Sequence, residues 1–135
     1  MSSIEQMGFL KTELENSIMD FQELLKESRD DEKDYDYSLE KYEERINIAL
    51  TLQTKASYVT SIIFRLINMT KPLFKKTQVG TKNYNQVKSA FDELKEYMDI
   101  YKSHVYTFSS KAKSLVNMLH IKQMASPDCL RGQGD

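Results

Sequence analysis

Apolar residues recur every three or four positions along three long stretches of this chain. The stretches cover residues 4–28, 36–70 and 83–124, and the last is the most regular. Its apolar positions are Val87, Phe91, Leu94, Met98, Tyr101, Val105, Phe108, Ala112, Leu115 and Leu119. The helical period places such positions on one face of an α-helix. The pattern therefore predicts an all-α protein built from three amphipathic helices.

Helix-breaking residues separate the second stretch from the third and end the third. Pro72 and Gly80 lie between the two stretches, so we expect the second helix to stop at residue 70. Asn83, followed by Gln86 three residues later, is the expected N-terminal cap of the third helix. Pro127 marks the expected end of that helix.

The topology depends on residues 26–36, which are highly charged but contain neither Gly nor Pro. Four aspartates in this segment favour a break, because Asp forms helix poorly and caps helix ends well. A break gives an elongated antiparallel three-helix bundle, or coiled-coil hairpin, whose second and third helices are ~50 and ~60 Å long. The alternative is two very long helices that pair as a dimeric four-helix bundle. Leu25 and Leu39 are 14 residues apart, so an unbroken helix would keep its apolar stripe in phase.

One domain accounts for the chain of 135 residues, which is 40% apolar and 29% charged. We assign residues 1–125 to a single helical domain and residues 126–135 to a flexible C-terminal tail. The only cysteine, Cys129, allows no internal disulfide. The N-terminus lacks a basic start, and no apolar stretch reaches the ~20 residues of a spanning helix. We therefore expect a cytoplasmic protein without a membrane span.

Charge is distributed unevenly, although the net charge is only −1. Residues 26–36 carry six acidic and three basic side chains, whereas residues 71–82 carry four lysines and no acid. In an antiparallel bundle these two connections lie at opposite ends. The molecule then becomes an electrostatic dipole, which can steer a charged partner.

The residue types used in catalysis are too scattered to predict an active site. His104 and His120 are 16 residues apart, whereas two histidines on one metal ion need neighbouring positions on a helix face. No Glu-x-x-His pair occurs, so the ligand pattern of a di-iron bundle is missing. We therefore expect no enzyme activity, no cofactor and no metal. A metal-binding helical bundle is kept as an alternative.

The second connection and the residues before it carry the best candidate for a binding surface. Residues 62–69 are apolar on more than one face, which exceeds what a three-helix bundle needs to cover. With the apolar residues of the connection they predict an exposed patch beside the lysines. The predicted partner-binding residues are Ile67, Leu73, Phe74, Lys75, Lys76, Val79, Lys82 and Tyr84.

These features favour a non-catalytic protein that binds another protein or a second copy of itself. It would act as an adaptor, a chaperone-like partner, an inhibitor or an assembly component, through apolar and aromatic helix faces and a basic loop. The alternative is an accessory protein that holds single-stranded nucleic acid with the lysines and aromatic rings of residues 71–84. Four lysines are few for that task, so the sequence favours a protein partner.

Overall fold

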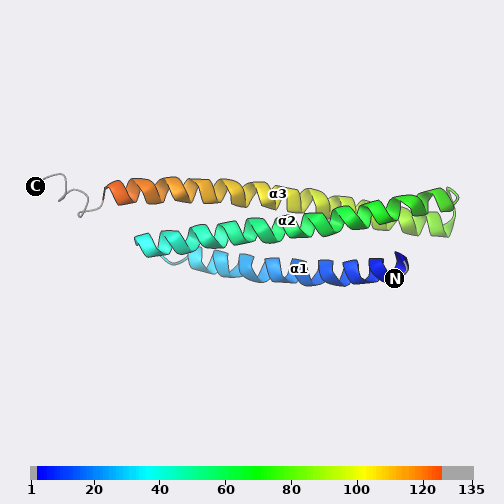
Figure 1. Ribbon diagram of the computed structural model, residues 1–135, viewed down its shortest axis with the longest axis horizontal. Coiled ribbons are helices and arrows are strands. Elements are labelled where there is room, and N and C mark those ends of the chain that lie inside the picture. Colours follow the sequence, from blue (N-terminus) through cyan, green and yellow to red (C-terminus); the bar gives the residue numbers. More distant parts are fainter. Residues whose placement is uncertain (1–2, 126–135) are drawn as a thin grey trace, which may run out of the picture.

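Three long antiparallel helices make up the part of the chain that the structure describes (Figure 1). The computed structural model describes residues 3–125, and no strand occurs among them. Helix α1 spans Ser3–Glu32, α2 spans Leu39–Lys76 and α3 spans Lys82–Met124. The predicted all-α three-helix bundle is confirmed, and the alternative of an unbroken first helix is wrong. Pro127 and the predicted tail, residues 126–135, lie outside the described residues.

Polar side chains in residues 33–38 replace the helical hydrogen bonds at the first break. The Asp34 carboxylate accepts a hydrogen bond from the Asp36 backbone N–H at 3.2 Å, and the Asp36 carboxylate accepts one from the Ser38 N–H at 2.9 Å. The Ser38 hydroxyl then accepts the Lys41 N–H at 3.2 Å and caps α2. Such local bonds compete with helix, as the aspartate count predicted. The break lies three to four residues later than expected, because α1 ends at Glu32 rather than at residue 28 and α2 begins at Leu39 rather than at residue 36.

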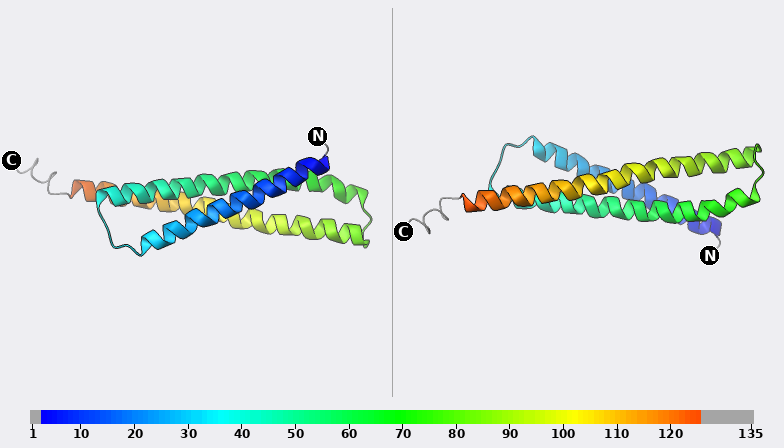
Figure 2. Two further views of the ribbon diagram at one scale, coloured as in Figure 1. Left: turned by 90° about the horizontal axis from the view of Figure 1, so that it is seen from below. Right: turned by 90° about the horizontal axis from the view of Figure 1, so that it is seen from above.

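Helix α2 continues through Pro72, so the predicted stop at residue 70 is wrong. Proline removes one backbone donor and disturbs one turn, which other contacts can offset. The next turn packs firmly, because the Phe74 ring lies 5.8 Å from the Tyr84 ring and 5.2 Å from the Phe91 ring of α3, centroid to centroid. The last turns of α2 bend relative to the rest of the helix (Figure 2). Only residues 77–81 form the turn, where Gly80 adopts a φ of 89° that favours glycine.

The N-terminal cap of α3 is Thr81 rather than the predicted Asn83. The Thr81 hydroxyl accepts a hydrogen bond from the Tyr84 backbone N–H at 3.2 Å. Threonine and asparagine are both good caps, so composition alone did not distinguish the two positions. The geometry of the turn decided between them, because Thr81 has the extended backbone that a cap requires.

Helix α2 is the centre of the bundle and is buried on two faces. It contacts both α1 and α3, and Leu52, Val59 and Ile63 are completely buried. Ile62, Ile63, Leu66 and Ile67, which were expected to exceed the needs of the core, are therefore part of it. The prediction of an exposed patch over residues 62–69 is wrong for these four residues. A helix between two neighbours needs two apolar faces rather than one.

Helix α1 crosses the hairpin formed by α2 and α3 diagonally (Figure 2). Phe21, only 1% exposed, lies at the crossing. Its ring centroid lies 5.3 Å from that of Tyr101, 4.9 Å from that of His104 and 6.0 Å from that of Phe108. These rings fill the space between α1 and α3. None of the described helices is long and apolar enough to cross a membrane.

Candidate protein-binding groove

The diagonal course of α1 leaves an apolar groove between its N-terminal half and α3. On that side of the Phe21 crossing the two helices separate, and the buried face of α2 becomes the floor (Figure 2). The groove has a volume of ≈ 480 Å³. This is within the ~300–1,000 Å³ of typical ligand pockets. We call it the α1–α3 groove.

Side chains from all three helices line the α1–α3 groove. Met7, Leu14 and Ile18 form the α1 wall, and Leu66 and Leu73 lie in the floor. These five side chains are apolar, and they follow the same faces that build the core further along the bundle. The groove is therefore a continuation of the core. It stays open because α1 diverges from α3 there.

The α3 wall consists of Val87, Ala90, Leu94 and Tyr97. Val87, Leu94 and Tyr97 are only partly buried, and Ala90 is exposed, although all four belong to a regular helical face. This wall extends about 16 Å at the rise of an α-helix, which is three turns. A helix of three turns matches its length.

Charged and polar side chains stand at the rim of the α1–α3 groove. Lys11 and Glu15 belong to α1, and Gln86 and Glu93 belong to α3. One base and two acids nearly balance each other along the body of the groove. An apolar floor with a polar rim is the usual composition of a protein-binding surface.

The predicted partner-binding residues divide into two groups in the structure. Leu73 lines the α1–α3 groove, whereas Ile67 is only 8% exposed and belongs to the core. Phe74 and Tyr84 are half-buried and pack against each other across the turn. Because each ring is partly covered by the other, less of its surface is available for stacking on a nucleic-acid base.

The other predicted residues lie on the surface of the hairpin tip, which we define as residues 71–88. Val79 is 82% exposed, and Lys75, Lys76 and Lys82 are exposed. The tip carries five lysines and no acidic residue. Within the described part of the chain, none of these lysines makes an ion pair. Acidic side chains of the described residues therefore leave the positive charge of the tip unneutralised.

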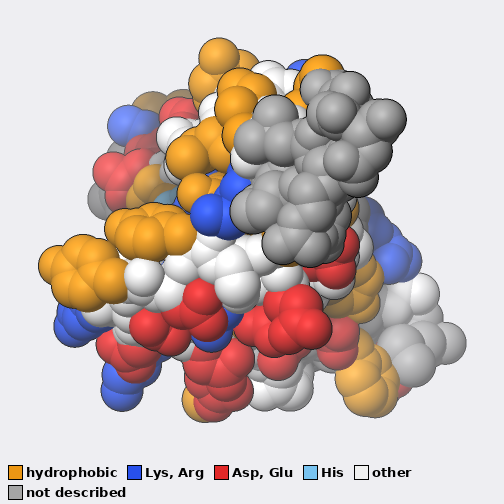
Figure 3. Space-filling view, turned by 90° about the vertical axis from the view of Figure 1, so that its left-hand side faces the viewer, with side chains coloured by type: hydrophobic (Ala, Val, Ile, Leu, Met, Phe, Trp, Pro, Cys, Tyr) orange, Lys and Arg blue, Asp and Glu red, His pale blue; other side chains and the backbone are white. Residues whose placement is uncertain are grey.

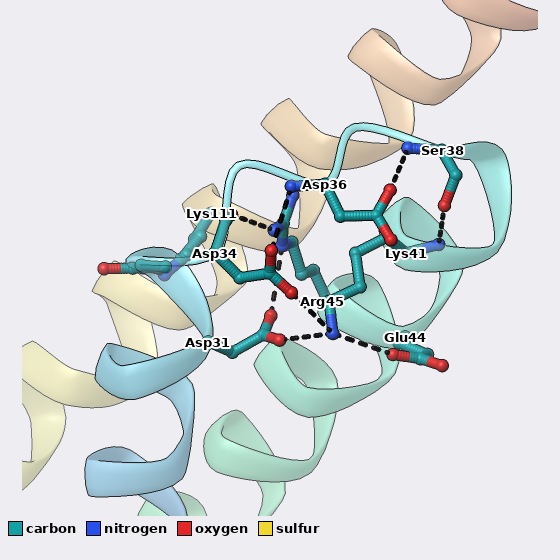
Figure 4. A network of polar contacts seen from close by, with 9 residues as sticks. Asp31, Asp34, Asp36, Ser38, Lys41, Glu44, Arg45 and Lys111 are labelled. Atoms are coloured by element: carbon teal, nitrogen blue, oxygen red, sulfur yellow. Dashed lines mark hydrogen bonds and ion pairs between the residues drawn. The ribbon is translucent and has the colours of Figure 1, made fainter.

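At the other end of the bundle, bases from α2 and α3 neutralise part of the acidic connection (Figure 4). The Asp31 carboxylate pairs with Lys41 at 2.6 Å and with Arg45 at 3.1 Å, and Glu32 pairs with Lys111. The hydrogen bond from Lys41 lowers the pKa of Asp31 below its usual value, and the same contact raises the pKa of Lys41. This network joins the end of α1 to the start of α2.

Acidic side chains still gather over the lower part of this end of the molecule (Figure 3). Asp30, Asp36, Glu40 and Glu43 are exposed there. The two connections lie at opposite ends of the bundle, as the predicted dipole requires (Figure 1). The ion pairs of Asp31 and Glu32 make the negative charge at this end weaker than the count of residues 26–36 indicated. The sequence alone does not show that bases of α2 and α3 reach the connection.

The described residues contain no group of three or more His, Cys, Asp or Glu side chains that could hold a metal ion. His104 is half-buried among aromatic rings at the α1 crossing, and burial lowers the pKa of its imidazole. His120 is exposed near the end of α3. The structure does not bring these two histidines together, and Cys129 lies outside the described residues.

The α1–α3 groove was not predicted, although the sequence pattern contained one signal for it. Val87 and Leu94 continue the regular stripe of α3 past the point where α1 diverges from α3. The stripe identifies an apolar face, but it does not reveal where the covering helix diverges.

Comparison with protein-family models finds no match to this chain, and comparisons with curated proteins and with solved structures find no significant match either.

Proposed function

We propose that this protein is a non-catalytic binding module that accepts an apolar segment of another protein in the α1–α3 groove. The observation that supports this proposal is the groove itself. It has a volume of ≈ 480 Å³, opens between α1 and α3, and is lined by apolar residues of all three helices. Apolar surface of this extent, framed by charged residues, is the usual mark of a protein-binding site. An adaptor, a chaperone-like partner, an inhibitor or an assembly component would each use such a surface.

The hairpin tip supplies the charged part of the proposed site. Its lysines are exposed beside one end of the groove, and unpaired charge of one sign accelerates the approach of an oppositely charged partner. We further propose that the protein acts in the cytoplasm, which is consistent with its single cysteine. The packing of Phe74 against Tyr84 supports a protein partner more than single-stranded nucleic acid.

A bulky substitution in the groove tests the proposal. Ala90 is exposed and lines the groove, so Ala90→Trp fills the space without disturbing a buried residue. Ser89 is also exposed and lies outside the groove lining, so Ser89→Trp is the matched control on the same helix. Circular dichroism and thermal melting would show that both variants keep the helical fold.

The assay is quantitative affinity purification from the native host with wild-type protein and both variants. We expect at least one protein whose recovery falls about tenfold with Ala90→Trp, which corresponds to ~1.4 kcal/mol, and is unchanged with Ser89→Trp. If every recovered protein responds equally to both variants, the groove is not the binding site. Salt-dependent retention of a single-stranded oligonucleotide by the wild-type chain would support the nucleic-acid alternative instead.

A further inference from the structure

We propose that the α1–α3 groove takes one amphipathic helix of a partner protein, with its C-terminal end at the hairpin tip and acidic residues in its last turn. This inference rests on the proposed function and specifies the chemistry and direction of the partner. It follows from three features of the structure: the direction of the surrounding helices, the position of the lysines and the length of the groove.

The direction of the surrounding helices favours one orientation of the guest. Helices α1 and α3 both begin near the hairpin tip, whereas α2 runs toward it (Figure 1). A guest helix whose C-terminus lies at the tip is antiparallel to both walls of the groove. It completes an up-down four-helix bundle. Its C-terminus, which carries about half a negative charge, then lies near the positive N-termini of α1 and α3.

Helical spacing places two lysines of the tip toward the groove, although neither belongs to its lining. Lys76 is three residues after Leu73, and Lys82 is four residues before Gln86, and both Leu73 and Gln86 line the groove. Residues three or four apart share a helix face. Lys76 and Lys82 therefore flank the outer end of the groove, where the last turn of the guest would lie. Acidic residues in that turn would supply the missing counter-charge.

The opposite end of the groove does not offer the same charge. There the Phe21 ring meets Tyr101, and the nearest charged rim residues, Glu15 and Glu93, are acidic. A guest with acidic residues in its first turn would place them near like charges. The charge pattern therefore favours acids at the C-terminal end of the guest and disfavours them at its N-terminal end.

Residues 126–135 are too few to be the guest. Ala125 is 28 residues beyond Tyr97, the nearest groove residue of α3, which is about 42 Å along a helix. Ten residues, 126–135, span at most about 35 Å when fully extended. They would have to reach the groove and also form three helical turns within it.

A display selection with helical peptides tests the inference. The library consists of 14-residue peptides with apolar residues at positions 2, 5, 6, 9 and 13 and with Glu, Lys or Gln at every other position, selected on the intact wild-type chain. We expect selected peptides to lose binding to Ala90→Trp and to keep it with Ser89→Trp. Among them, Glu should be enriched in the last turn and depleted in the first.

Matched lysine variants test the charge contact directly. Lys71 and Lys75 are each two residues from Leu73, so they lie on the side of α2 that faces away from the groove. Fluorescence anisotropy would compare Lys76→Gln/Lys82→Gln with Lys71→Gln/Lys75→Gln, using a selected peptide labelled at its N-terminus. We expect about fivefold to tenfold weaker binding for the groove-side pair and less than about twofold for the other pair at low salt.

Each outcome bears on a different part of the proposal. If no peptide is selected that Ala90→Trp blocks, the proposed function fails together with this inference. If such peptides are selected but Glu is equally frequent in the first and last turns, or both lysine pairs have equal effects, the inference is wrong while the groove remains a binding site. Light scattering that shows a dimer, which Ala90→Trp dissociates, would identify the occupant as a second copy and overturn the inference.

Discussion

Replacement of Phe21 by alanine should remove the main contact that holds α1 on the hairpin. The side chain is 1% exposed and contacts three aromatic rings of α3. A Phe side chain buries roughly 150–250 Å². At about 25 cal/mol per Å² and after allowance for the alanine that remains, the lost burial amounts to roughly 2–4 kcal/mol. The cavity and the lost ring contacts raise the expected cost to about 3–5 kcal/mol.

The matched control is Phe9→Ala on the same helix. Phe9 is 65% exposed, so the same chemical change there should alter stability by no more than about 0.5 kcal/mol. Urea denaturation followed by circular dichroism would give the free energy of unfolding of each variant. Because a domain of this size is stable by only ~5–15 kcal/mol, the loss at Phe21 should lower the unfolding midpoint clearly.

A loss below about 1 kcal/mol for Phe21→Ala, or equal losses for both variants, would refute the conclusion that the crossing at Phe21 positions α1. A separate early transition in Phe21→Ala would show α1 leaving the hairpin before the hairpin itself unfolds. That outcome would agree with the structure, since α2 and α3 pack along much of their length while α1 crosses them diagonally (Figure 2).

Two further predictions concern the ends of the helices. The hydrogen bond from Lys41 lowers the pKa of Asp31 from its ordinary 3.8. The ionised carboxylate therefore stabilises the fold at pH values above 3.8, and this contribution is lost as the pH falls through the lowered pKa. Asp31→Asn should therefore cost about 1 kcal/mol at pH 7 and show a weaker loss of stability than the wild type in urea titrations below pH 4; parallel pH profiles would contradict this. Thr81→Ala should cost about 1 kcal/mol in the same assay, whereas Asn83→Ala should be nearly neutral, and the reverse order would restore Asn83 as the cap.

The proposed binding surface includes the groove as well as the hairpin tip. The predicted site lay in the connection, where lysines and apolar residues are adjacent in the chain. In the structure Phe74 and Tyr84 stabilise the turn, and Ile67 supports the core. Leu73 connects the predicted surface to the groove, and the lysines remain exposed beside it.

Sequence by itself determined the three helices and, to within one residue, the start of α1 and both limits of α3. The period of apolar residues depends only on backbone geometry, so the three helices and the break near residues 33–38 followed from local pattern and from the capping tendency of aspartate. The local pattern predicted the end of α2 wrongly, because proline normally ends a helix. In the structure α2 continues past Pro72, and Phe74 in the next turn packs against α3.

Only the tertiary structure decided how the apolar faces are shared. The burial of Ile62 and Ile67 depends on α2 having a neighbour on each side, which no local pattern specifies. The α1–α3 groove depends on the angle at which α1 crosses at Phe21, and that angle is set by side chains from three helices packed together. Periodicity gives the direction of a face along one helix, whereas the space between two helices depends on both of them at once.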